Sequence, residues 1–114
     1  MQSKRITFVE TDVFSSRVAR LSLESAVRDL QLELVEDPER GPLDAGTGGL
    51  RKMRMAVPGS ARGKSGGVRV HYLWLEHIDR IYLVFVYGKG EQDSLSAEQK
   101  TALKQIVQRI KDDA

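Results

Sequence analysis

The chain has 114 residues, of which 40% are hydrophobic and 30% are charged, and these values are typical of one globular domain. No apolar run approaches the ~18 residues that a membrane-spanning helix needs, and the first residues do not follow the pattern of a signal peptide. The absence of cysteine excludes disulfides, thiolate metal sites and a cysteine nucleophile. We therefore expect a single cytoplasmic domain over residues 1–114.

Three elements are predicted in the first third of the chain. Residues 5–10 alternate apolar and polar side chains, which predicts a strand, and residues 11–21 predict a short helix or turn. Residues 22–38 predict an amphipathic helix that Ser22 caps and Pro38 ends. The apolar stripe of this helix consists of Leu23, Val27, Leu30 and Leu34.

Three strands and a last helix are predicted beyond the turn-rich segment 37–49. Residues 50–57 and 68–75 alternate, whereas residues 81–87 are apolar on both faces, as expected for a central strand reached through a short hairpin loop. Residues 94–113 predict a helix that begins with a capping box of Ser96 and Gln99. The order β-α-α-β-β-β-α predicts an α+β domain. We expect a curved, antiparallel-rich sheet of about four strands with the helices packed on one face.

Basic residues are concentrated in one part of the chain. Residues 45–75 contain six Lys or Arg and no Asp or Glu, whereas the other residues carry twelve basic and sixteen acidic side chains. A basic segment on an otherwise acidic protein is typical of a polyanion site, and a solvated basic loop is the alternative. The glycines of this segment, at residues 46–49 and 63–67, are expected to turn the chain tightly beside a phosphate.

The two-residue period of the strands predicts which cations share a surface. Lys52 and Arg54 lie on one face of their strand, and Arg69 lies on one face of the next strand. If these faces coincide, three like charges are gathered at a cost in free energy, and a bound anion would offset this cost. His71 has the same parity as Arg69, so it is a candidate substrate contact, and an exposed strand residue is the alternative.

Several other motifs point away from common chemistries. The segment "GSARGKSGG" has one residue too few for a P-loop, and it precedes a strand rather than a helix. His71 and His77 are the only histidines and lack metal-ligand spacing, and His77 is expected to be exposed at a hairpin. The strand aromatics are either stacking platforms for bases or core residues; they are Tyr72, Trp74, Tyr82 and Phe85. Tyr87 ends the central strand beside Lys89, so its hydroxyl is expected to reach a sheet edge.

Three segments carry a resemblance to a known family: "GTGGLRKMRMA", "GKSGGVRVHYLWL" and "IYLVFVYGKGEQDSLSAEQ". In this order they resemble the RelE/HigB toxins of bacterial toxin–antitoxin systems, in particular the HigB-like branch. The resemblance covers nearly the whole chain. It implies a RelE-like fold and a ribosome-dependent endoribonuclease that cuts mRNA in the decoding site. In such toxins the RNA 2′-hydroxyl attacks the adjacent phosphate without a metal or cofactor and leaves a cyclic phosphate and a 5′-hydroxyl.

On this resemblance, the basic residues receive provisional roles. Arg54 and Arg69 would stabilise the phosphorane, because the guanidinium fork grips phosphate. Lys52 and Lys64 are candidates for the general base, since neighbouring cations disfavour a protonated amine. Tyr87 or Lys89 would orient the scissile region or move a proton. The residues expected to bind RNA without a chemical role are Arg51, Arg62 and His71.

The resemblance also implies partners, and two other functions stay open. We expect a cognate antitoxin, a small helix-turn-helix protein, in a heteromeric complex that can bind operator DNA through the antitoxin, together with mRNA and the ribosome. One alternative is a binding module that holds RNA or the ribosome without cutting. The other is a corepressor that acts with a DNA-binding antitoxin and needs no active site on this chain.

Overall fold

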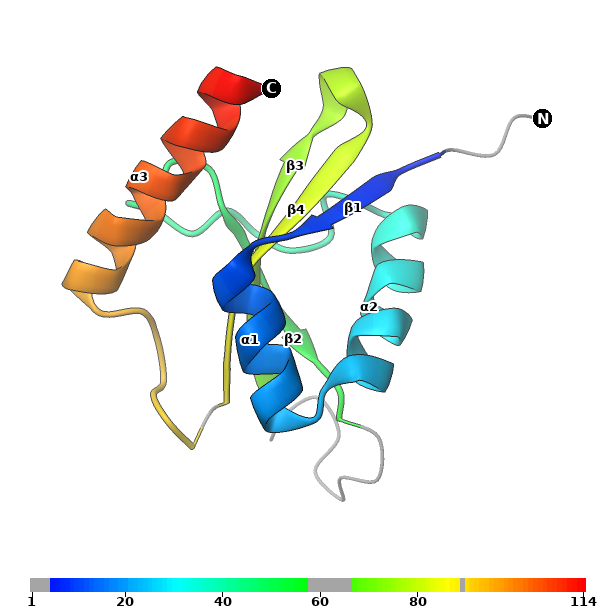
Figure 1. The fold of residues 1–114 in the computed structure, drawn as a ribbon, viewed down its shortest axis with the longest axis vertical. Coiled ribbons are helices and arrows are strands. Elements are labelled where there is room, and N and C mark those ends of the chain that lie inside the picture. Colours follow the sequence, from blue (N-terminus) through cyan, green and yellow to red (C-terminus); the bar gives the residue numbers. More distant parts are fainter. Residues whose placement is uncertain (1–4, 58–66, 89) are drawn as a thin grey trace.

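The computed structural model describes residues 5–57, 67–88 and 90–114, and the predicted order of elements is confirmed (Figure 1). The first half of the chain contains β1 (Thr7–Glu10), α1 (Asp12–Leu21), α2 (Glu24–Glu36) and β2 (Arg51–Met55). The second half contains β3 (Val68–Leu75), a single 3-10 turn (Glu76–Ile78), β4 (Arg80–Gly88) and α3 (Ala97–Asp113). This mixture of helices and one sheet is the predicted α+β class.

The four strands form one sheet in the order β1-β4-β3-β2. β1 is parallel to β4, and the other two pairings are antiparallel. β4 is therefore central, as its apolar residues on both faces predict. β2 is the outermost strand on its side of the sheet, and residues 42–44 run along its outer edge.

The helices divide between the two faces of the sheet (Figure 1). α1 and α2 pack on one face against residues that include Met53, Val70 and Leu83. α3 covers part of the opposite face through Leu103 and Val107. The expectation that all helices lie on one face is wrong in this respect. The reason is that β3 and β4 also present apolar residues to the second face, and that surface must be buried; these residues are Leu73, Leu75, Val84 and Tyr87.

The helix ends are fixed by local hydrogen bonds. Thr11 caps α1, because its Oγ1 accepts from the amide of Phe14, and the same hydroxyl donates to the Val84 carbonyl of β4 at 2.8 Å. The predicted capping box of Ser96 and Gln99 begins α3. Ser22 does not cap α2. It is the left-handed C-cap of α1, with φ of 56°, and Leu23 precedes α2 without a side-chain cap.

A β-bulge in β4 decides which residues face the open part of the sheet. Tyr72 pairs with Leu83 and His71 pairs with Phe85, so Val84 has no partner on β3. Leu83 and Val86 both pack against α1 and α2 because the alternation changes at the extra residue. Without the bulge, Tyr87 would share the face of Leu83. With it, Tyr87 lies on the opposite face, together with Arg69.

A connection from α2 to β2 runs over residues 37–50 and is held by buried groups. The Tyr72 hydroxyl donates to the Pro38 carbonyl at 2.8 Å and accepts from the amide of Gly41 at 3.0 Å. The amide of Lys52 donates to the Pro42 carbonyl at 2.9 Å. These bonds place the connection along the outer edge of β2.

Within the described ranges, no helix has the length and apolar character required to cross a membrane.

Candidate active site

β2 and β3 bring three predicted cations onto one face of the sheet. Arg54 pairs with Arg69 across the antiparallel ladder, and Lys52 pairs with His71. Met53 and Met55 point the other way, into the core against α1 and α2. The two strand faces therefore coincide, which the sequence analysis left as a condition. We call the surface formed by Lys52, Arg54 and Arg69 the basic face.

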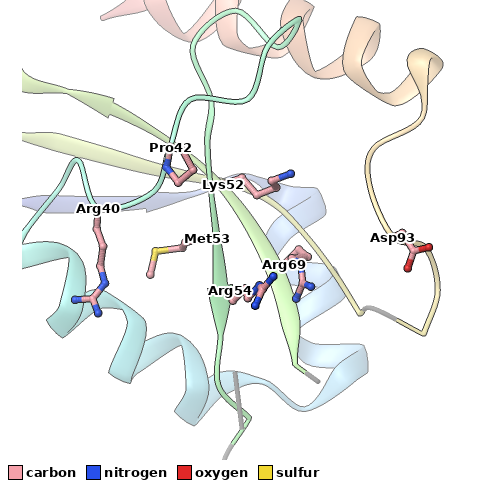
Figure 2. Close-up of a pocket in the computed structure, with 7 residues that line it drawn as sticks. All are labelled: Arg40, Pro42, Lys52, Met53, Arg54, Arg69 and Asp93. Atoms are coloured by element: carbon pink, nitrogen blue, oxygen red, sulfur yellow. The ribbon is translucent and has the colours of Figure 1, made fainter. Parts of the chain in front are cut away.

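The basic face opens into a pocket of about 500 Å³ along the edge of β2 (Figure 2). Figure 2 shows Arg54 and Arg69 next to each other, Lys52 above them, and Asp93 across the pocket. Arg40, Pro42 and Met53 complete the lining. Within the part of the chain that the structure describes, no hydrogen bond or ion pair holds the side chains of Lys52, Arg54 and Arg69. Their charges are available to an anion.

Arg69 is the most buried of the three cations. Arg69 is only 9% exposed, and its Nη1 is buried with no hydrogen-bond partner among the described residues. A buried guanidinium nitrogen without an acceptor carries an uncompensated desolvation cost. A phosphate oxygen in the pocket would supply the missing acceptor, and it would do so with a charge-assisted bond.

Tyr87 lies opposite Arg69 on β4, but its position differs from the prediction. The residue is 0% exposed, and its hydroxyl is buried without a partner among the described residues. The expectation that this hydroxyl reaches a sheet edge is wrong, because β4 is central and the side chain packs with Leu95 and Leu103. Leu103 belongs to α3 and Leu95 to the segment just before it, and we call these two parts together the α3 layer. Burial raises the pKa of the Tyr87 phenol above 10, although the charge of Arg69 opposes this shift. The phenol is thus a proton donor at neutral pH.

His71 is also buried under the α3 layer. It is 0% exposed, so the reading of an exposed strand residue is wrong, and its ring offers no surface to RNA. Its Nε2 lies 2.8 Å from Oδ2 of Asp44, and its ring stacks on Tyr87 with centroids 5.9 Å apart. Burial lowers the pKa of His71 below 6.5, and the hydrogen bond to Asp44 only partly opposes this shift. The ring is therefore neutral at pH 7.

Among the other predicted basic residues that the structure describes, Arg51 does not join the basic face. Arg51 has the parity of Met53, and its guanidinium donates to the Gly41 carbonyl at 2.8 Å and pairs with Glu39 at 3.4 Å. It holds the connection between α2 and β2 rather than an open anion site. His77 is exposed in the turn after β3, as predicted. Arg62, Lys64 and Lys89, which the sequence analysis also places at the site, lie outside the described residues.

The glycines at residues 46–49 serve a different surface from the one expected. Gly46, Gly48 and Gly49 have φ of 82°, 80° and 119°, so a tight turn is present, but it packs against α3. Lys100 donates to the Ala45 carbonyl and Lys111 to the Gly48 carbonyl, at 3.1 and 2.9 Å. The expectation that these glycines turn beside a phosphate is wrong, because they dock the last helix instead.

Sequence reasoning missed the acidic neighbours of the site. Asp44 lies in the turn-rich connection. Burial raises its pKa, but the hydrogen bond with His71 and the charges of Lys100 and Lys52 outweigh this effect, so the pKa lies below the ordinary value of 3.8. Asp93 lies in the segment after β4 and lines the pocket. Neither residue has a signal in the sequence, because each reaches the site through a loop whose path is set by tertiary contacts.

A comparison with protein families agrees with this geometry. The family model described as "RelE toxin of RelE / RelB toxin-antitoxin system" matches residues 11–113. The match covers most of the chain. The chain belongs to the RelE toxin family. The resemblance drawn from the three sequence segments is thereby confirmed at the level of this family.

Membership in the RelE family assigns the general role of the chain. It is a toxin of a toxin–antitoxin system, and a cognate antitoxin is its partner. RelE toxins are in general ribonucleases that inhibit translation. The match begins at Thr11, the residue that caps α1 and bonds to β4, and it ends in the last turn of α3. The helices on both faces of the sheet thus fall within the family match.

Proposed function

We propose that this RelE-family toxin is a ribosome-dependent endoribonuclease that cuts mRNA in the decoding site and so stops translation. The observation that carries the proposal is the basic face, where Lys52, Arg54 and Arg69 line one pocket without partners among the described residues. Such a surface suits an RNA phosphate. Action on translating ribosomes would place the toxin in the cytoplasm.

The chemistry assigned to the pocket follows from charge and proton transfer. The RNA 2′-hydroxyl attacks the adjacent phosphorus, the bond from phosphorus to the 5′ oxygen breaks, and a 2′,3′-cyclic phosphate and a 5′-hydroxyl result. Arg54 and Arg69 stabilise the phosphorane, and the free Nη1 of Arg69 supports this role. Lys52, in its neutral amine form, takes the proton of the 2′-hydroxyl. No metal ion takes part in this proposed route.

Tyr87 is the proposed proton donor to the leaving 5′ oxygen. Its raised pKa keeps the phenol protonated, and its hydroxyl has no other partner among the described residues. Because the residue is fully buried, the α3 layer must open locally before the hydroxyl can meet RNA. Lys64 and Lys89 remain proposed participants in proton transfer, and Arg62 remains a proposed RNA contact. His71 is fully buried, so it is no longer proposed as an RNA contact.

The proposed partners complete the system. The antitoxin is proposed to be a small helix-turn-helix protein that forms a heteromeric complex with this chain and carries it to operator DNA. The mRNA is the proposed substrate, and the ribosome is the proposed partner on which the mRNA is cut. Assignment to the HigB-like branch also belongs to this proposal.

The test is to add the purified chain to a translating extract and to map the 5′ ends of the mRNA, with and without ribosomes. We expect new ends within codons only on translated mRNA, and none with Arg54→Ala or Arg69→Ala. Arg28→Ala is the matched control, because Arg28 is exposed on α2, on the other side of the sheet. Cleavage of naked RNA would replace the proposal with a free ribonuclease. Binding to ribosomes without new ends would favour the binding module.

A further inference from the structure

Asp44 and His71 form a hydrogen-bonded pair directly beside the basic face. The Asp44 Oδ2 lies 2.8 Å from the His71 Nε2, and the His71 side chain is fully buried while that of Asp44 is 13% exposed. The other carboxylate oxygen of Asp44 lies 3.5 Å from the Lys100 Nζ. The pair therefore joins three parts of the fold, namely β3, the connection before β2, and α3.

His71 adjoins the proposed site on both neighbouring strands. His71 lies opposite Lys52 in the β2–β3 ladder, and its ring stacks on Tyr87 with an interplanar angle of 24°. Arg69 precedes it on the same face of β3. The ring is thus placed between the proposed base and the proposed acid, and it is not itself open to solvent.

The charges around the ring keep it neutral. The groups that face it are Asp44 from the connection, Lys52 from β2, Lys100 from α3 and Tyr87 from β4, with Arg69 on its own strand. Burial lowers the pKa of His71, the hydrogen bond and charge of Asp44 raise it, and the two lysines lower it. The neutral ring donates Nε2–H to Asp44, which leaves Nδ1 as a bare acceptor without a partner among the described residues.

We propose that Asp44 and His71 are a positioning pair for the cleavage reaction: the uncharged ring, oriented by Asp44, holds Tyr87 and Lys52 in place and governs the chemical step rather than RNA binding. This inference rests on the function proposed above. Packing alone does not account for the pair. An apolar side chain would fill the same space without burying a carboxylate, an imidazole and an unpaired nitrogen.

The first test does not depend on activity. The chain has two histidines, so NMR can follow both imidazoles during a pH titration, with His77→Gln used to assign them. We expect a titration midpoint below 6.5 for His71. Asp44→Asn should lower this midpoint further, because it removes the attraction of the carboxylate, whereas Lys100→Met should raise it, because it removes a repulsion. A midpoint at or above 6.5, or one that neither variant moves, would refute the neutral pair.

The same samples test whether the pair holds its neighbours. Asp44→Ala should shift the ring resonances of Tyr87 and the side-chain resonances of Lys52, whereas Lys100→Met should leave them nearly unchanged. If Asp44→Ala leaves Tyr87 and Lys52 in place, the positioning role is wrong even if the toxin cuts mRNA. If the wild-type chain is inactive, the proposed function fails, and the resonances still decide whether the pair positions its neighbours.

The second test measures cleavage on stalled ribosome complexes as a function of toxin concentration. His71→Phe retains an aromatic ring against Tyr87 but loses the bond to Asp44. We expect Asp44→Ala and His71→Phe each to lower the saturating rate about 10- to 100-fold with little change in the half-saturating concentration. The double variant should be no slower than the slower single variant, because the two residues act as one unit. The proposal would be wrong if the rate reductions of the two single variants multiply in the double variant, or if the variants change the half-saturating concentration alone.

Discussion

Arg54 and Arg69 face each other across the β2–β3 ladder, so two guanidinium groups occupy directly opposed positions on one face of the sheet. Like charges in such a pair destabilise a sheet. In addition, the Arg69 Nη1 is buried without an acceptor among the described residues. A sheet selected only for stability would not place these two residues opposite each other. The arrangement indicates a surface that is completed by a bound anion.

Replacing Arg54 should therefore separate stability from activity. We expect Arg54→Gln to raise the free energy of unfolding by ~0.2–1 kcal/mol, because the repulsion from Arg69 is removed. The same variant should lower the rate of mRNA cleavage about 10²- to 10³-fold, since a donor to the transition state is lost. Urea denaturation and the ribosome cleavage assay measure the two effects. Arg28→Gln, on exposed α2, is the control; a destabilised Arg54→Gln would show that Arg54 has a stabilising partner.

The salt dependence of RNA binding should report the number of cations on the basic face. If Lys52, Arg54 and Arg69 each neutralise one phosphate, the logarithm of the association constant for a single-stranded RNA should fall with the logarithm of salt concentration with a slope of about −2. Each substitution by Ala should reduce the magnitude of the slope by about 0.7. A 2′-O-methyl RNA prevents cleavage during the titration. A slope unchanged by all three substitutions would place the RNA elsewhere.

The strands could be predicted well from the sequence, because local periodicity carries the information. The predicted strand 68–75 coincides with β3, and the shared face of Lys52 and Arg54 on β2 follows from a period of two. The register between β2 and β3 could not be derived in this way. It depends on how far the connecting segment reaches, and the sequence has no local signal for that.

The parts that could not be predicted depend on contacts between distant segments. The bulge at Val84 moves Tyr87 to the basic side of the sheet, and it is stabilised by Thr11, which lies 73 positions earlier. The burial of His71 likewise depends on Asp44 and Lys100. The alternation within one strand shows that His71 shares the parity of Arg69. It does not show that α3 covers His71 and leaves Arg69 beside a pocket.

The Gly41 position offers a test of how tightly Lys52 is held. A Cβ atom added at Gly41 would lie 2.6 Å from the backbone oxygen of Lys52 and 3.2 Å from a ring carbon of Tyr72. Gly41→Ala must therefore shift β2 or the connection that carries residue 41, and we expect a loss of ~1–3 kcal/mol in the free energy of unfolding together with slower cleavage. Gly90→Ala is the matched control, because no atom of the described residues lies within 4 Å of the added atom. Equal effects of the two variants would contradict the tight approach.

The stability of the fold should decrease in mildly acidic solution because of His71. Burial holds the folded-state pKa of His71 below the ordinary value of 6.5. The unfolded chain therefore takes up a proton near pH 6.5 while the folded chain does not, so stability is complete above 6.5 and is lost progressively as the pH falls toward the folded-state pKa. The lowered pKa values of Glu91 and Asp44 act only below their ordinary values of 4.5 and 3.8. A decrease between pH 7.5 and 5.5 thus isolates His71.

Urea denaturation at pH 7.5, 6.5 and 5.5 measures this decrease. We expect the wild-type chain to lose stability across this range, and we expect His71→Phe to show a smaller loss, because its ring cannot take up a proton in either state. His77→Gln is the control, since His77 is exposed in the turn after β3 and this variant keeps His71. If His71→Phe and the wild type lose stability in parallel, the buried ring is not the group that responds to pH. A smaller loss confined to His71→Phe would establish that the neutral imidazole is part of the folded state.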